Sequence, residues 1–190
     1  VALAKQLLLV EETGVRAHFG QLSCKSSVEL IRIAKAKGLA VTADVAMHQL
    51  HLTDAAIDGF NSLAHVRPPL RSETDRLASC AAVICSHHQP LNAAAKLAPF
   101  AATEAGISAL ETVLPLGLKL VREGLLTEDV LWRALTVNPA RIAGIKAGAL
   151  ATGGGVVVID TESSWSVAPE HLVSAGHNTP FLGMMVQGKV

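Results

Sequence analysis

Two adjacent histidines stand where a short apolar segment ends, in the sequence AAVICSHHQP at residues 81–90. Two earlier segments have the same form, VRAHFGQLS at residues 15–23 and LAVTADVAMHQL at residues 39–50. Imidazole rings bind metals and exchange protons near neutral pH. Four of them lie near the ends of these segments, those of His48, His51, His87 and His88. Their types predict either a metal site or a set of hydrogen-bonded histidines, and the sequence leaves both interpretations open.

The elements that must position these side chains are strands, each followed by a helical pattern. We predict strands over residues 15–22, 39–45 and 82–86. Polar residues at the carboxyl ends of three strand-then-helix units are typical of a parallel α/β sheet or barrel. Adjacent His87 and His88 would face opposite sides of a regular strand.

Caps and prolines predict further element boundaries. Ser26 and Glu29 have the spacing of a capping box, in which each side chain bonds backbone at the start of a helix. A long helix is expected over residues 107–123, with a kink or join at Pro115. A strand is predicted at residues 156–160, followed by short strands and turns. The pattern changes near residue 147.

Composition excludes several classes of partner. Half of the 190 residues are hydrophobic, so the chain can bury a sizeable core. Its 16 basic and 16 acidic residues balance and form no basic cluster, which argues against nucleic acid. No apolar run is long enough to span a membrane, and no signal sequence is present, so we expect a soluble, cytoplasmic protein without a membrane partner. Three cysteines are too few for a disulfide framework.

Five segments, in order along the chain, resemble landmarks of the dihydroorotase family in the amidohydrolase superfamily. They are SVELIRIAKAKGLAVTADV (27–45), RPPLR (67–71), GISALETVLPL (106–116), TVNPARIAGI (136–145) and NTPFLG (178–183). The resemblance implies an α/β fold, a (β/α)8 TIM-type barrel with a small all-β domain. It also implies zinc chemistry that closes carbamoyl aspartate to dihydroorotate.

The resemblance further implies that this chain is the C-terminal half of such a protein. Residues 1–146 would hold the last barrel strands and helices, and residues 147–190 part of the small β domain. The chain begins inside a helical pattern and stops where a strand begins, which also predicts a fragment. The missing N-terminal half is therefore an expected partner.

Two positions that the resemblance assigns to catalysis are altered. Gln21 stands where the family's HxST motif has a histidine ligand, and His87 stands where its TDHAPH motif has the aspartate that handles the proton. A glutamine amide is a poor zinc ligand, and a neutral imidazole lacks the carboxylate's negative charge. We therefore expect no metal and no cofactor.

The substrate side of the resemblance departs as well. His48 and His88 match family histidines, whereas Arg67 replaces an asparagine expected to contact substrate. These three residues would line a degenerate pocket.

The leading hypothesis is a non-catalytic homologue in pyrimidine biosynthesis that supports aspartate carbamoyltransferase, a role implied by the resemblance alone. The alternative is an active zinc-dependent cyclic amidohydrolase with a rearranged metal site. A third possibility is a relic pocket that senses a pyrimidine intermediate.

Overall fold

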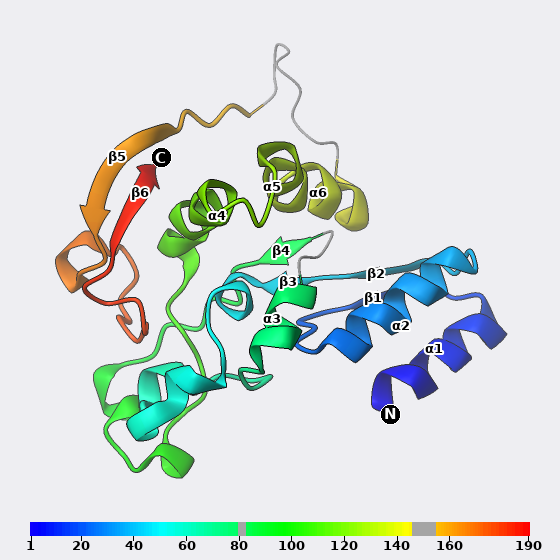
Figure 1. Cartoon of the computed structure of the whole chain (residues 1–190), viewed down its shortest axis with the longest axis horizontal. Helices are drawn as coiled ribbons and strands as arrows, with labels where there is room; N and C mark the ends of the chain where they lie inside the picture. The colour runs from blue at the N-terminus through cyan, green and yellow to red at the C-terminus, as the bar shows by residue number, and fades with distance from the viewer. Residues whose placement is uncertain (80–82, 146–154) are drawn as a thin grey trace.

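The computed structural model describes residues 1–79, 83–145 and 155–190 and has a mixed α/β architecture (Figure 1). Its α-helices are α1 (Ala2–Thr13), α2 (Lys25–Ala36), α3 (Glu73–Ala78), α4 (Val113–Arg122), α5 (Glu128–Leu135) and α6 (Val137–Ala143). Its strands are β1 (Ala17–Phe19), β2 (Val41–Ala43), β3 (Val45–Ala46), β4 (Ile84–Cys85), β5 (Asp160–Ser166) and β6 (Met185–Lys189). Short 3-10 turns, among them η1 (Met47–Leu50) and η4 (Ala93–Lys96), connect them.

The first four strands form two parallel pairs, as the strand-then-helix pattern predicts. Ala17 of β1 is in register with Val41 of β2, and Val45 of β3 with Ile84 of β4. A parallel bridge then joins His88 to the segment that follows the next loop. Because the strands run in one direction, their carboxyl ends face the same edge, where the histidines lie.

The last two strands form an antiparallel hairpin that packs on α4, at the opposite side of the molecule from α1 (Figure 1). The indole Nε1 of Trp165 donates to the carbonyl of Gly188 at 3.0 Å, which ties β5 to β6. A Cβ atom at Gly188, where φ is 114°, would lie 2.5 Å from Leu118 Cδ1, so a larger residue here would strain the backbone and displace the Leu118 side chain.

The buried apolar residues form two main clusters. The smaller one packs α1 and α2 against β1 and β2; its buried members are Leu7, Val10, Leu22, Ile31, Ala34, Val41 and Ala43. The larger one contains η1, α4, α5 and the hairpin, and its bulkiest members are Met47, Leu50, Ile107, Leu116, Leu120 and Leu131. The polar edge described below lies where these clusters meet, at the ends of β1 to β4.

Three predictions of local structure are wrong: the capping box, the start of the strand at residue 156, and the long helix over residues 107–123. Helix α2 begins at Lys25 without a side-chain cap, so the capping box of Ser26 and Glu29 does not form, and Glu29 pairs with Arg32 instead. The strand predicted at residues 156–160 begins only at Asp160. The predicted architectural boundary near residue 147 lies outside the described residues.

The third error concerns the long helix predicted over residues 107–123. Ile107 forms the parallel bridge with His88, and α4 begins only at Val113. Pro115 therefore lies in the first turn of α4, where a missing N–H costs no helical hydrogen bond. None of the helices in the described ranges is long and apolar enough to cross a membrane.

Candidate functional site

Asp44 is the centre of a polar group at the ends of the parallel strands, between β2 and β3. Its Oδ2 bonds His18 Nε2 at 2.7 Å, and its Oδ1 accepts from the Gln21 backbone N–H at 2.8 Å and from Cys85 Sγ at 3.1 Å. The other ring nitrogen of His18 bonds the Thr42 hydroxyl at 2.8 Å. We call these five residues the Asp44 cluster. It joins three neighbouring strands through one carboxylate.

The side chains of Asp44, His18 and Cys85 are already hydrogen-bonded within the cluster. Burial, followed by the bond to Asp44, raises the pKa of the Cys85 thiol to about 12. The thiol is therefore protonated at neutral pH and acts as a donor rather than a nucleophile. Both ring nitrogens of His18 are bonded. Asp44 therefore anchors neighbouring groups at the strand ends.

Gln21 and His87, the two altered positions, share an unusual backbone conformation. Gln21 has φ 59° and His87 has φ 47°, both in the left-handed region that residues other than glycine seldom adopt. Each residue lies two positions beyond the end of a strand of the parallel set, Gln21 after β1 and His87 after β4. Such backbone costs about 1 to 3 kcal/mol and persists where the surroundings enforce it. The assumption of a regular strand through His87 and His88 is therefore wrong.

The left-handed turn places the ring of His87 against that of His48, with centroids 5.7 Å apart and planes at 27°. His48 is 1% exposed, and neither of its ring nitrogens has a hydrogen-bond partner in the part of the chain described here. Burial and then the nearby His87 lower the pKa of His48 to about 3. Burial also lowers the pKa of His87, against an opposing effect of Asp44. Both rings are neutral at pH 7.

The other two histidines of the predicted group are directed elsewhere. His51 Nε2 bonds the carbonyl of Leu116 in α4 at 3.0 Å, and burial lowers its pKa to about 4. His88 Nδ1 accepts the backbone N–H groups of Ala109 and Leu110, both at 3.0 Å. The structure therefore brings His48 and His87 together, and does not assemble the four histidines.

His88 also begins a chain of hydrogen bonds that the sequence did not reveal. Because its Nδ1 accepts, its Nε2 carries the proton and faces the Ser174 hydroxyl at 3.4 Å. That hydroxyl donates to Glu111 Oε1 at 2.5 Å, and the Ser174 N–H donates to the same oxygen at 2.7 Å. Burial would raise the pKa of Glu111, but the bonds from Ser174 outweigh it and lower the pKa. This chain ties the end of β4 to the C-terminal segment.

The donor set does not fit a zinc site within the described residues. Zinc sites use three or four protein ligands. His48 and His87 offer two imidazoles, while Cys85 is protonated and Asp44 accepts from three donors. The ranges 1–79, 83–145 and 155–190 contain no group of three or more histidine, cysteine or acidic residues placed to hold a metal.

The remaining predicted site residues lie at or near the surface. The Gln21 side chain is exposed, and no bond of its amide is found among the described residues. Arg67 is also exposed; burial, followed by the charges of Lys96 and Arg67, lowers the pKa of His65. Buried Gln49, which the sequence did not single out, donates to the carbonyl of Pro68 at 3.0 Å and holds this loop against η1.

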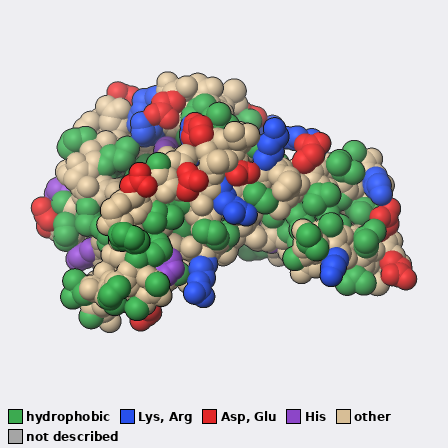
Figure 2. Space-filling model, turned by 60° about the horizontal axis from the view of Figure 1, so that its bottom comes forward, with side chains coloured by type: hydrophobic (Ala, Val, Ile, Leu, Met, Phe, Trp, Pro, Cys, Tyr) green, Lys and Arg blue, Asp and Glu red, His purple; other side chains and the backbone are tan. Residues whose placement is uncertain are grey.

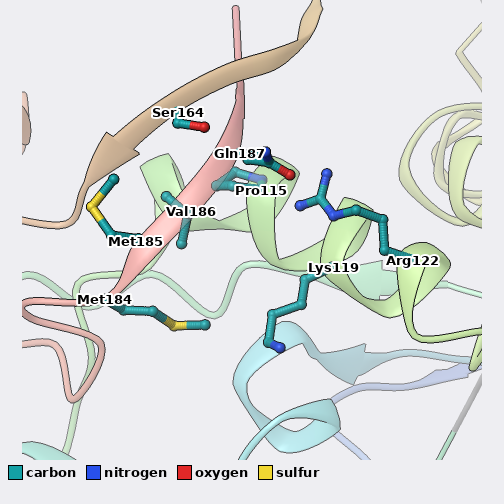
Figure 3. Close-up of a pocket in the computed structure, with 8 residues that line it drawn as sticks. All are labelled: Pro115, Lys119, Arg122, Ser164, Met184, Met185, Val186 and Gln187. Carbon is teal, nitrogen blue, oxygen red and sulfur yellow. The ribbon is translucent and has the colours of Figure 1, made fainter.

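A cleft of about 290 Å³ lies between α4 and the hairpin. Its lining includes two cations, Lys119 and Arg122, and the polar residues Ser164 and Gln187. Figure 3 shows the two cationic heads pointing in different directions, and Lys119 already pairs with Glu123. The cleft therefore does not present converging charges to a ligand.

Comparison with known proteins finds relatives that match the whole of this chain. It is 50% identical to a dihydroorotase-like protein of Pseudomonas aeruginosa and 48% identical to one of Pseudomonas putida; each match covers 100% of this chain and 47% of the relative. A dihydroorotase of Anaeromyxobacter dehalogenans is 41% identical, with 46% of its length covered. No family model matches the chain.

The chain also superposes on solved structures over nearly its whole length. An L-hydantoinase from Arthrobacter aurescens superposes with a TM-score of 0.90 at 25% identity, over 98% of this chain and 45% of that one. The inactive dihydroorotase-like domain of a Chaetomium thermophilum CAD-like multifunctional protein superposes with a TM-score of 0.72 at 28% identity, over 98% and 51%.

The mixed α/β fold superposes on about half of a hydantoinase chain and of a dihydroorotase-like domain. In sequence the chain is similar, along its whole length, to dihydroorotase-like proteins, as its five landmarks predicted. It spans about half the length of the curated relatives it matches.

Proposed function

We propose that this chain is part of a catalytically degenerate dihydroorotase-like protein that supports aspartate carbamoyltransferase as a non-catalytic subunit. The observation that carries the loss of catalysis is the pairing of His87 with His48. At the position where the family's aspartate would handle a proton, a neutral imidazole lies against a second neutral imidazole. Neither supplies the negative charge that would hold a cation beside bound water.

The Asp44 cluster supports the same proposal. Family dihydroorotases would place a histidine ligand at Gln21, but here the Gln21 backbone is bonded to Asp44 and its amide faces solvent. The Asp44 carboxylate at this edge is engaged by three donors. Likeness to a solved domain described as inactive and dihydroorotase-like is consistent with this interpretation.

We further propose that the parallel strands are the last strands of a (β/α)8 barrel, and that the hairpin belongs to a small β domain. Two separate strand pairs leave edges that a closed barrel would pair. Figure 2 shows apolar side chains on the surface of the narrow end, where α1 and α2 lie. Leu8 and Leu9 of α1 are 65% and 60% exposed. The other half of the barrel would cover such surfaces.

An active zinc-dependent cyclic amidohydrolase with a rearranged metal site is the second candidate. The two ring nitrogens of His48 favour it, because they are buried without a partner among the described residues. A metal or a substrate atom would satisfy one of them. In that case residues beyond this chain would have to supply the remaining ligands.

The test uses the purified full-length protein. We expect no conversion of dihydroorotate with or without added zinc. Co-expression with aspartate carbamoyltransferase from the same organism should give one larger complex, and the transferase expressed alone should be less stable or less active. Zinc-dependent turnover abolished by His87→Ala would establish the second candidate instead. Two species that do not co-purify, with the transferase fully active alone, would contradict the subunit role.

A further inference from the structure

Lys96 is a buried cation outside the site described above. It ends the short turn η4, and its side chain and backbone together are 8% exposed. Its Nζ donates to the carbonyl of Glu104 at 2.7 Å and to that of His65 at 3.4 Å. No carboxylate lies within ion-pair distance of it in the described parts of the chain. Lysine is seldom buried in this way without a counter-charge.

Carbonyl oxygens compensate only part of the cost of burying an ammonium group. Each carries a partial charge, and an ammonium has three N–H groups, of which two are directed at carbonyls here. Burial accordingly lowers the pKa of Lys96, although the charge of Glu104 opposes the effect. A group that remains costly in the folded state points to a role other than stability.

Lys96 also forms part of the wall of a cavity of about 400 Å³. Three segments far apart in sequence build this cavity, around residues 62–63, 91–97 and 175–178. The volume lies within the range of small-molecule sites. Its apolar lining comes from Leu63, Leu91 and Leu97, and Leu97 is 81% exposed at the rim.

Hydrogen bonds hold the walls in place. The Ser62 hydroxyl donates to the Lys96 carbonyl at 2.9 Å, which joins the first segment to the second. Asn178 accepts from the Leu91 N–H at 2.7 Å and donates to the Gln89 carbonyl at 3.0 Å, which joins the second to the third. The cavity is therefore built by cross-linked segments and is not a gap between loose loops.

We propose that this cavity binds a small carboxylate with an apolar body. The carboxylate would supply the ion-pair partner that Lys96 lacks among the described residues, and the leucine side chains would cover the apolar part of the ligand. His177, also in the lining, adds a polar group at the opposite segment. The cavity shares no residue with the Asp44 cluster or with the pair of His48 and His87, so the inference stands apart from the proposed function.

The probe is 3-phenylpropanoate, which carries a carboxylate on an apolar body. Its controls are 3-phenylpropan-1-ol, which is neutral, and 3-phenylpropylamine, which is cationic. We expect the acid to raise the melting temperature of the full-length protein in a saturable way, the alcohol to bind about tenfold more weakly, and the amine to have no effect. This comparison uses unaltered protein and does not depend on any variant folding.

A matched pair of variants then assigns the effect to one side chain. Lys96→Met keeps the length of the side chain without its charge, and Lys5→Met makes the same change at an exposed lysine of α1. Binding of the acid should weaken about tenfold in Lys96→Met and stay unchanged in Lys5→Met. Equal binding of acid and alcohol, no binding of the acid, or a folded Lys96→Met variant that binds as well as the unaltered protein would overturn the proposal.

Discussion

The ring of His87 stacks on the ring of His48 at a centroid distance of 5.7 Å, and the pKa of each ring is lowered from its ordinary value. Burial is the main cause for both. Protonating either ring would place a charge in an apolar setting beside another imidazole. The contact exists because His87 turns through a left-handed backbone conformation at the end of its strand. Several measurable properties follow from this pair and its surroundings.

Acid should unfold the protein through its buried histidines. The folded-state pKa values of His48 and His51, about 3 and about 4, lie below the 6.5 of the unfolded chain. The stability they contribute is fully present above pH 6.5 and is lost as the pH falls from 6.5 toward 3, because the unfolded chain binds the extra protons. Between pH 7 and pH 5 we expect a loss of about 2 kcal/mol for each fully buried histidine. Urea unfolding at both pH values measures it.

Replacement of His48 tests whether its nitrogens truly lack partners. His48→Leu removes two buried polar atoms while keeping most of the volume, so stability at pH 7 should change by less than about 1 kcal/mol and the loss at pH 5 should shrink. The exposed His171→Gln serves as control and should leave the difference between pH 7 and pH 5 unchanged. A loss above about 3 kcal/mol at pH 7 would instead indicate a bound partner such as a metal.

Asp44→Asn should destabilise the strand ends. The change keeps the shape but turns one acceptor into a donor facing His18 or Cys85, and it removes the charge paired with His18. We expect a loss of about 1 to 3 kcal/mol in urea unfolding. Glu29→Gln removes an exposed ion pair with Arg32 and should cost less than about 0.5 kcal/mol. Equal effects of the two changes would mean that the Asp44 cluster adds nothing to stability.

Some helix starts depend on local interactions and therefore leave local signals in the sequence, although the capping box of Ser26 and Glu29 did not form. The Ser72 side chain caps α3 and the Thr127 side chain caps α5, because an N-cap bond spans only three residues. The helix predicted from Ile107 onward was wrong in its start, because the apolar residues of this segment also suit a helix. Gly106, with φ 153° and its N–H bonded to the His65 carbonyl, instead sets the chain into an extended bridge.

The candidate site was predictable in its residue types but not in its contacts. Asp44 was visible at a strand end, yet its partners His18 and Cys85 lie 26 and 41 residues away and depend on which strands are neighbours. Glu111 lies inside the landmark segment 106–116 but nothing there indicated its partner, and Ser174 belongs to no motif; the two meet only through tertiary packing. The left-handed backbone at His87 could not be predicted either, because glycine is the usual sequence signal for this conformation and the residue here is a histidine.

The close contact between α4 and α5 predicts how a substitution at Gly117 changes stability. In an exposed helix, Gly→Ala normally stabilises by about 1 kcal/mol. At Gly117, however, a Cβ atom would lie 2.6 Å from a methyl group of Leu131, which is fully buried. We expect Gly117→Ala to destabilise by about 1 to 3 kcal/mol. In a double-mutant cycle with Leu131→Ala, the combined loss should be smaller than the sum of the single losses; additive losses would refute the close contact.

Restoring the two altered positions should not restore catalysis. In Gln21→His with His87→Asp, the new aspartate would lie near Asp44, and the stacking on His48 would be lost. Arg67 would still occupy the position of an expected substrate-binding asparagine. Catalytic groups that act as a unit give strongly non-additive effects, so two repairs recover little rate. We expect the zinc-supplemented, full-length double variant to convert no dihydroorotate above background in a spectrophotometric assay, with an active dihydroorotase as positive control. Clear turnover by this variant would show that only two residues separate the protein from its active relatives, and the proposal that several functions have been lost would fail.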